Sequence, residues 1–190
     1  MKKIIFILAL IAISTINIFG DNMKKVVFVV APEVFRDEEY IEPKTILEKA
    51  GTEVTTASTV AGEIYGKIKI KAWSQMLVKD IKVEDFDAVF FVGGNGASVY
   101  FDDKIAHNVA KSFYDNGKIV SAICIAPVIL AKAGLLNGKK ATVFPSGADI
   151  LKQNGADYTG KSVEVDGNII TGNGPEAAKL FGETLLQKLK

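Results

Sequence analysis

Residues 118–134 read KIVSAICIAPVILAKAG, and this stretch decides the fold. The run 118–123 predicts a buried strand, because it is apolar and contains β-branched residues. Cys124 follows at once, and residues 126–133 predict a helix that Gly134 ends. A strand that turns directly into a helix is the building unit of an α/β fold.

The same alternation extends to both sides of this stretch. Residues 25–31 (KVVFVVA) form an apolar run without polar alternation, which predicts a strand buried on both faces of a parallel sheet. Strands alternating with helices predict one doubly wound α/β domain, with helices on both faces of a mainly parallel sheet. We predict further strands at 53–58, 87–92 and 141–144, short strands or a hairpin within 62–80, and a hairpin around Asp166-Gly167. We predict helices at 37–50 (kinked or delayed by Pro43), 103–116, from a Ser146 cap to 154, and from Pro175 to 189.

Cys124 stands where the central strand meets its helix. Ala122 and Ala126 give the small-x-nucleophile-x-small pattern of a nucleophile elbow, in which a tight turn lifts the side chain above the sheet. The helix N-terminus would favour a thiolate there. The alternative is a buried structural cysteine, which packs as a small apolar group.

Gly93 and Gly94 follow the predicted strand 87–92, at the edge where α/β proteins form their sites. A dinucleotide motif starting at Gly94 would need glycine where Val99 stands, so that interpretation fails. The better functional interpretation is an oxyanion site made by the N–H groups of Gly94 and Ile125. The alternative is a plain tight turn.

Glu39 lies near the start of the first predicted helix. Acidic residues at a helix start complement the helix dipole, which accounts for Asp37 and Glu38. For Glu39 we predict a carboxyl beside the cysteine, with a raised pKa, that donates a hydrogen bond to sulfur or moves a proton. The single histidine, His107, is predicted on a helix surface, so a Cys-His pair is not expected.

The composition excludes several classes of protein. The formal net charge is +1 and basic residues form no run longer than isolated pairs, so no nucleic-acid partner is expected. One cysteine and one histidine exclude an internal disulfide and a Cys/His zinc site, and we expect neither metal nor cofactor.

Residues 1–22 differ from the remainder of the chain. Two lysines precede an apolar run to Phe19, the pattern of a secretory signal peptide. We therefore expect a protein exported to the periplasm or secreted, without stable membrane association once the signal is removed. An uncleaved anchor and a cytoplasmic protein started at Met23 remain the alternatives. Residues 23–190 form the predicted domain.

Three stretches taken together resemble the ThiJ/PfpI superfamily: the cysteine elbow SAICIAP at 121–127, the glycine pair in FVGGN at 91–95, and EYIEP at 39–43. The resemblance covers residues 23–190, and GNGP at 172–175 fits the entry to the family's last helix. It implies a flavodoxin-like, class I glutamine amidotransferase-like fold and a homodimer. It also implies Cys124 as nucleophile or redox centre, Glu39 as its hydrogen-bonding partner, and an oxyanion site at Gly94 and Ile125.

The sequence departs from the family at two points. Protease-type members carry histidine directly after the cysteine, where this chain has Ile125, so peptidase activity is not expected. Deglycase-type members carry a histidine after the following strand, where Phe144 and Pro145 stand. Our first hypothesis is an enzyme that acts on small reactive carbonyls through Cys124 and Glu39. The alternatives are a redox-sensing stress protein whose Cys124 meets an oxidant, and a ligand-binding module without catalysis.

Overall fold

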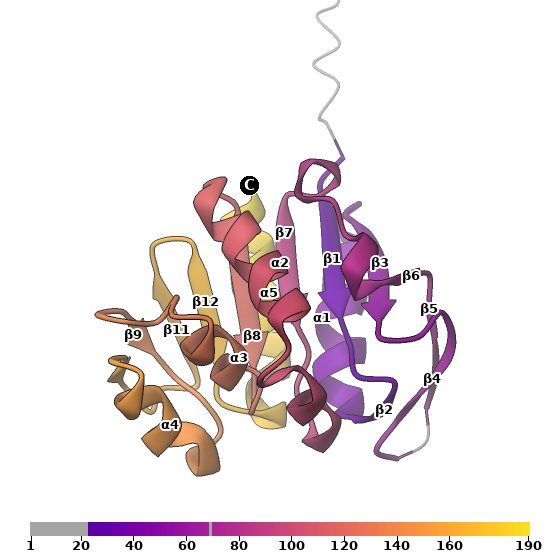
Figure 1. The fold of residues 1–190 in the computed structure, drawn as a ribbon. Helices are drawn as coiled ribbons and strands as arrows, with labels where there is room; N and C mark the ends of the chain where they lie inside the picture. The colour runs from indigo at the N-terminus through magenta and orange to yellow at the C-terminus, as the bar shows by residue number, and fades with distance from the viewer. Residues whose placement is uncertain (1–22, 69) are drawn as a thin grey trace, which may run out of the picture.

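The computed structural model describes residues 23–68 and 70–190, so the predicted signal peptide at 1–22 lies outside the described residues. A seven-stranded sheet stands between two layers of helices (Figure 1). Its order is β11-β12-β8-β7-β1-β3-β6, and all neighbours are parallel except β11 and β12. The predicted flavodoxin-like fold is confirmed. The strands are β1 (Lys25–Val29), β3 (Glu53–Ser58), β6 (Met76–Leu77), β7 (Ala88–Phe91), β8 (Ile119–Ile123), β11 (Val163–Asp166) and β12 (Ile169–Gly172).

The sheet is covered on both faces because its central strands are apolar on both sides. Val27 and Val29 of β1 belong to one buried cluster, and Val26 and Phe28 belong to the other. Helices α2 (Lys104–Asp115) and α3 (Pro127–Lys132) pack on the first face, together with α4 (Ala148–Gln153). Helices α1 (Asp37–Lys49) and α5 (Ala178–Leu189) pack on the second.

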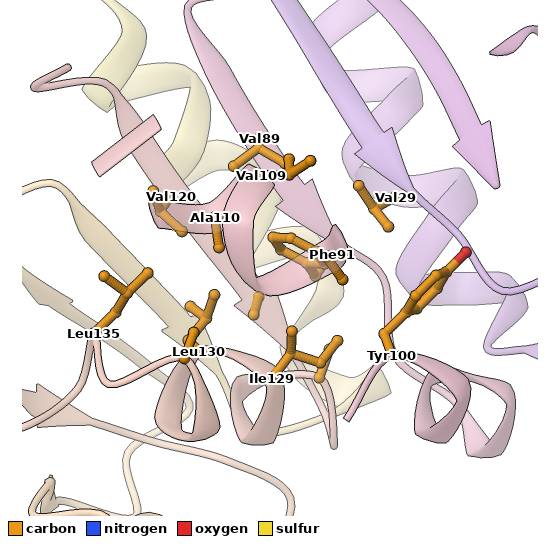
Figure 2. Packing of buried hydrophobic residues seen from close by; sticks show 14 of the residues in the cluster. Val29, Val89, Phe91, Tyr100, Val109, Ala110, Val120, Ile129, Leu130 and Leu135 are labelled. Carbon is orange, nitrogen blue, oxygen red and sulfur yellow. The ribbon is translucent and has the colours of Figure 1, made fainter. Parts of the chain in front are cut away.

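Aromatic side chains fill both layers. On the α1/α5 face, Phe28 meets Phe90 edge-on with ring centroids 4.7 Å apart, and Phe90 lies 4.8 Å from Phe181 of α5. On the other face, Phe91 of β7 packs among side chains of α2 and α3 (Figure 2). There the buried Tyr100 hydroxyl donates a hydrogen bond to the Val30 carbonyl at 2.9 Å.

Two small sheets flank the main one. Strand β2 (Glu33–Phe35) pairs with the antiparallel hairpin of β4 (Gly62–Gly66) and β5 (Lys71–Ser74), and β9 (Lys140–Ala141) pairs with β10 (Asp157–Tyr158). The predicted short strands and hairpin within 62–80 are confirmed, as is the hairpin at Asp166-Gly167. Short 3₁₀ turns complete the chain at Val78–Asp80, Val83–Asp85, Asn95–Tyr100, Pro145–Gly147 and Pro175–Ala177.

Two predictions around residue 144 are wrong. The predicted strand 141–144 ends after Ala141, because the next backbone groups bind elsewhere: the Thr142 N–H donates to Thr171 Oγ1 at 2.9 Å. Ser146 does not cap α4, which begins after Gly147 without a side-chain cap. Ser146 lies instead in the exposed 3₁₀ turn before that helix.

Pro43 was predicted to kink or delay its helix, and no delay occurs: α1 begins at Asp37 and continues through Pro43 to Lys49. The proline packs where α1 meets α5, and a Cβ on Gly182 would lie 2.8 Å from Pro43 Cα. Within the described ranges, no helix has the length and apolar character needed to cross a membrane.

Candidate active site

Cys124 occupies a strained turn at the carboxyl end of β8. Its φ is 61°, a left-handed conformation that non-glycine residues rarely adopt. Ala122 and Ala126 on either side are fully buried, which agrees with the need for small flanking residues. The Cys124 N–H donates to the Gly172 carbonyl at 2.9 Å, and its carbonyl accepts from the Phe144 N–H at 2.7 Å. The turn is therefore held from both sides.

The glycine pair after β7 allows the surrounding groups to converge on the sulfur. A Cβ on Gly93 would lie closer than 3.0 Å to Glu39 Oε2, Cys124 Cβ and the Ile123 carbonyl. Gly94 has a φ of 94°, and a Cβ there would clash with the backbone of residues 34–36. Both positions require glycine because no room is left for a side chain.

Glu39 projects from the first turn of α1 and is fully buried. Neither carboxyl oxygen has a hydrogen-bond partner of ordinary geometry among the described residues, and the groups that face them are the Cys124 thiol and the Gly93 N–H. Burial raises the pKa of Glu39 to about 8, against the opposing effects of these two groups and of Arg36. The carboxyl is therefore protonated at neutral pH and available as a donor to sulfur.

The environment of the thiol differs from the sequence prediction. Burial, followed by the charge of an ionised Glu39, raises the pKa of the Cys124 thiol to about 12, although the N–H groups of Gly94 and Ile125 face the sulfur and lower it. The predicted preference for thiolate at a helix N-terminus is wrong, because burial outweighs that effect. Helix α3 has six residues and begins with Pro127, which has no N–H to offer.

Each group affects the pKa of the other: the Cys124 thiol lowers the pKa of Glu39, and an ionised Glu39 raises the pKa of Cys124. Both groups hold their protons at neutral pH. The first proton leaves the pair near pH 8, the raised pKa of Glu39. The resulting carboxylate lies beside a thiol, which is the arrangement of a general base next to a nucleophile.

A cavity of about 270 Å³ lies over the sulfur. Phe101 and Phe144 give it apolar walls, and Arg36 and Lys67 contribute positive charge. The remaining lining residues are Gly94, Asn95, Ser98, Cys124, Ile125, Ser146 and Pro175. Larger hollows, of about 450, 510 and 380 Å³, lie beside α2, at the amino-terminal ends of β1 and β3, and where the end of α1 meets the end of α5. None of the three contains Cys124, so the smaller cavity is the candidate active site.

The structure thus brings together every residue of the predicted site: Cys124, Glu39, Gly93, Gly94 and Ile125. Their chemical roles remain predictions. Sequence reasoning missed the two cationic residues of the cavity. Arg36 could have been suspected from its place three residues before Glu39, but Lys67 carries no sequence signal.

His107 takes no part in the cavity lining. It is half-buried on α2, and its ring Nε2 lies 2.9 Å from the Phe101 carbonyl, to which it is hydrogen-bonded. In the described part of the chain, no group of three His, Cys, Asp or Glu side chains is arranged to hold a metal ion. The chemistry available at the cavity is therefore that of a thiol, a carboxyl, backbone N–H groups and two cations.

Fold and site together define an α/β protein with a cysteine in a strained strand-to-helix turn. Residues 24–188 match the DJ-1/PfpI family, and the chain belongs to that family. An uncharacterised protein of Methanocaldococcus jannaschii is 41% identical, with 100% of this chain and 98% of that protein covered. A deglycase of Pyrococcus horikoshii is 34% identical over 80% of this chain and 90% of its own length. The crystal structure of a ThiJ/PfpI domain protein from Brachyspira murdochii superposes with a TM-score of 0.86 at 34% identity, covering 88% of this chain and 96% of that one.

Proposed function

We propose that this protein is an enzyme that converts small reactive carbonyl compounds, with Cys124 as nucleophile and Glu39 as the group that moves protons. The observation that supports it most is the buried carboxyl of Glu39 facing a cysteine held in a strained elbow. Among the relatives, the deglycase of Pyrococcus horikoshii gives the proposal its reaction class.

The first step is addition of the thiol to the carbonyl carbon. A bond forms between Sγ and carbon, the thiol proton passes to the Glu39 carboxylate, and the π electrons of the carbonyl move to its oxygen. The N–H groups of Gly94 and Ile125 stabilise that oxygen, which then takes the proton from Glu39. The product of this step is a neutral hemithioacetal.

With an α-oxoaldehyde such as methylglyoxal, the reaction can continue without any external oxidant. Glu39 removes the proton from the hemithioacetal carbon and returns it to the neighbouring carbonyl carbon. The hydroxyl proton of the hemithioacetal moves to the neighbouring oxygen, so that the first carbon is oxidised to a thioester and the second is reduced to an alcohol. The resulting thioester is hydrolysed by water, which releases a 2-hydroxy acid and restores the thiol. Because no histidine lines the cavity, Glu39 serves in every proton transfer.

An aldehyde-consumption assay tests the proposal. Purified protein is given methylglyoxal, and loss of aldehyde is measured together with the appearance of lactate, with Cys124→Ser and Glu39→Gln as variants. We expect turnover in the wild type, none in Cys124→Ser, and a loss of about 100-fold or more in Glu39→Gln, the size typical of a general acid–base residue. Equal turnover in wild type and Cys124→Ser, or none in either, would reject the enzyme.

A second candidate function is redox sensing, which the N–H groups of Gly94 and Ile125 favour because they face the sulfur and could bind a sulfinate oxygen. A peroxide would oxidise the thiol to sulfenic acid with release of water, and a second equivalent would give the sulfinic acid. Intact-mass measurement after mild peroxide treatment tests this. A stable product with two added oxygens, lost in Cys124→Ser, supports the sensor, and an unmodified thiol rejects it.

We extend the proposal to assembly and location: a homodimer, exported from the cytoplasm. Sedimentation of the purified protein measures the assembly, and a single-subunit mass at all concentrations would reject the dimer. Cell fractionation with sequencing of the mature N-terminus measures the location, and an intact chain in the cytoplasm would reject export.

A further inference from the structure

We propose that the cavity over Cys124 selects carbonyl compounds that carry a negatively charged group, such as α-oxoaldehydes with a separate carboxylate, and that Lys67 and Arg36 bind this group while the carbonyl faces the sulfur. The catalytic half of this inference rests on the proposed function. The anion preference of the cavity does not, and it can be measured without turnover.

Arg36 is fixed beside the site by its own backbone. Its N–H donates to the Gly93 carbonyl at 3.0 Å, which ties the residue to the glycine pair next to Cys124. Arg36 lines the cavity, and its guanidinium forms an ion pair with Glu38, with Nε and Oε2 2.7 Å apart. A guanidinium has five N–H donors, so the pair with Glu38 leaves donors for a second anion.

Lys67 reaches the same cavity from the turn of the β4–β5 hairpin. Its backbone N–H donates to the Phe35 carbonyl at 2.8 Å, directly before Arg36 in the chain. Among residues 23–68 and 70–190, no carboxylate lies within ion-pair distance of its ammonium group. On the same hairpin Lys71 does have such a partner, Glu63, with Nζ and Oε2 3.3 Å apart. Lys67 thus lines the cavity, and its ammonium group has no ion-pair partner among the described residues.

The carboxyls nearest the cavity do not line it: Glu38 is paired with Arg36, and Glu39 is buried against Cys124 and protonated at neutral pH. Both charged side chains of the lining are cationic, and none of the lining residues is Asp or Glu. Phe101 and Phe144 form walls that carry no charge and limit the contact of a bound ligand with water, which strengthens an ion pair. The volume of about 270 Å³ fits a small molecule with one anionic group.

The test uses two alkylating reagents of nearly equal size that react with the same sulfur, iodoacetate (anionic) and iodoacetamide (neutral). The ratio of their rates at Cys124 reports the preference of the cavity for negative charge. The rates are measured by intact mass at low ionic strength in the wild type, in Lys67→Met, and in Lys71→Met. Lys71→Met is the matched control, because it removes a lysine of the same hairpin that does not line the cavity.

We expect Lys67→Met to lower the ratio of the iodoacetate rate to the iodoacetamide rate about threefold to fivefold, which is the effect of one partly exposed ion pair. Added salt should also reduce this ratio in the wild type, because it screens the attraction. Lys71→Met should leave the ratio unchanged, and Arg36→Gln combined with Lys67→Met should lower it further. An unchanged ratio in Lys67→Met, an equal change in Lys71→Met, or a thiol that neither reagent reaches would overturn the inference.

A second arm separates this inference from the proposed function. Turnover of 4,5-dioxopentanoate, an α-oxoaldehyde with a separate carboxylate, and of neutral methylglyoxal is compared in the wild type and in Lys67→Met. The anion preference predicts that KM rises for 4,5-dioxopentanoate alone. A lowered alkylation ratio without turnover of either compound would sustain the anion site and reject the enzyme. Turnover of both compounds with the same KM values in the wild type and in Lys67→Met would support the proposed enzyme and overturn the anion site.

Discussion

The floor of the cavity and its rim are built in different ways. We call floor the group of Cys124 and Gly94, which line the cavity, with Glu39 and Gly93, which pack against Cys124 without lining it. All four come from strand ends and the first turn of α1 and are buried. The rim consists of Arg36, Lys67, Phe144 and Ser146, which lie in turns and loops or at a helix start and are exposed or half-buried. The floor holds the thiol and the carboxyl within the packed core, whereas the rim can change without disturbing the sheet.

The residues of the floor and of the rim are therefore under different structural constraints. At the floor a single methyl group would clash with Glu39 and Cys124, so its geometry is fixed by packing. At the rim, the side chains line the cavity and lie in turns and loops, where substitution disturbs little packing. We therefore expect floor substitutions to change stability and reactivity together, and rim substitutions to change only which ligands bind.

Gly93→Ala gives the largest expected effect. Its Cβ would overlap Glu39, Cys124 and the Ile123 carbonyl, so we expect a loss of about 3 kcal/mol in the free energy of unfolding, and loss of turnover. Urea denaturation measures the stability. Gly138→Ala is the control, because Gly138 has a φ of 70° but open space around its Cβ, and only backbone strain of about 1 kcal/mol is expected. Equal effects of the two variants would show that the floor is not tightly packed.

Glu39→Gln should alter how stability depends on pH. In the unfolded chain Glu39 ionises near its ordinary pKa of 4.5, whereas in the folded protein it stays protonated to about 8. Between these values the folded state binds more protons, so wild-type stability falls as pH rises, by up to roughly 4 kcal/mol. The difference between wild-type and Glu39→Gln unfolding free energies, measured from pH 4.5 to 8, isolates this contribution. A difference that does not change with pH would mean that Glu39 is ionised in the folded protein.

Val34→Asn tests strain close to the rim. Val34 and Cys124 are the non-glycine residues with positive φ in the described part of the chain, and Val34 is β-branched, with a φ of 55°. Asparagine tolerates this conformation better, so we expect a gain of about 1 kcal/mol in the free energy of unfolding. Urea denaturation measures it. A loss of stability would show that contacts of the valine outweigh its strain.

Lys67→Met should have the smallest effect on folding. Its ammonium forms no ion pair with the described residues, so the free energy of unfolding should change by less than about 0.5 kcal/mol, although the preference for anionic reagents falls. Urea denaturation of this variant and of Lys71→Met gives the comparison. A large loss of stability would place Lys67 with the floor and remove the distinction between the two regions.

The residues of the floor could be predicted from the sequence because packing and backbone geometry restrict the residue types that these positions accept. Alanines around Cys124, glycines after a strand, and an acidic residue in a first helical turn each reflect a local constraint. The rim residues could not be predicted in this way. Lys67 reaches the cavity because its hairpin pairs with β2, and no local sequence pattern specifies that tertiary contact. The same reason explains the error at 141–144, where backbone groups bind Thr171 and Cys124 instead of extending a strand.

The sequence predicted a lowered pKa for the Cys124 thiol, whereas the structure gives a raised one. The sequence shows the helix that follows Cys124 but does not show how deeply the sulfur is buried. Burial is a property of the whole fold, and here it raises the pKa of both members of the pair. What the sequence did specify is that the two groups belong at the same edge of the sheet.

The most direct test of the coupling between Cys124 and Glu39 is the pH dependence of Cys124 alkylation by iodoacetamide, in the wild type and in Glu39→Gln. We predict that the wild-type rate rises with a midpoint near pH 8, as Glu39 ionises and accepts the thiol proton. In Glu39→Gln this step should disappear, and the rate should follow the buried thiol alone. The same pH profile in both proteins would contradict the coupled site, and with it the role of Glu39 in catalysis.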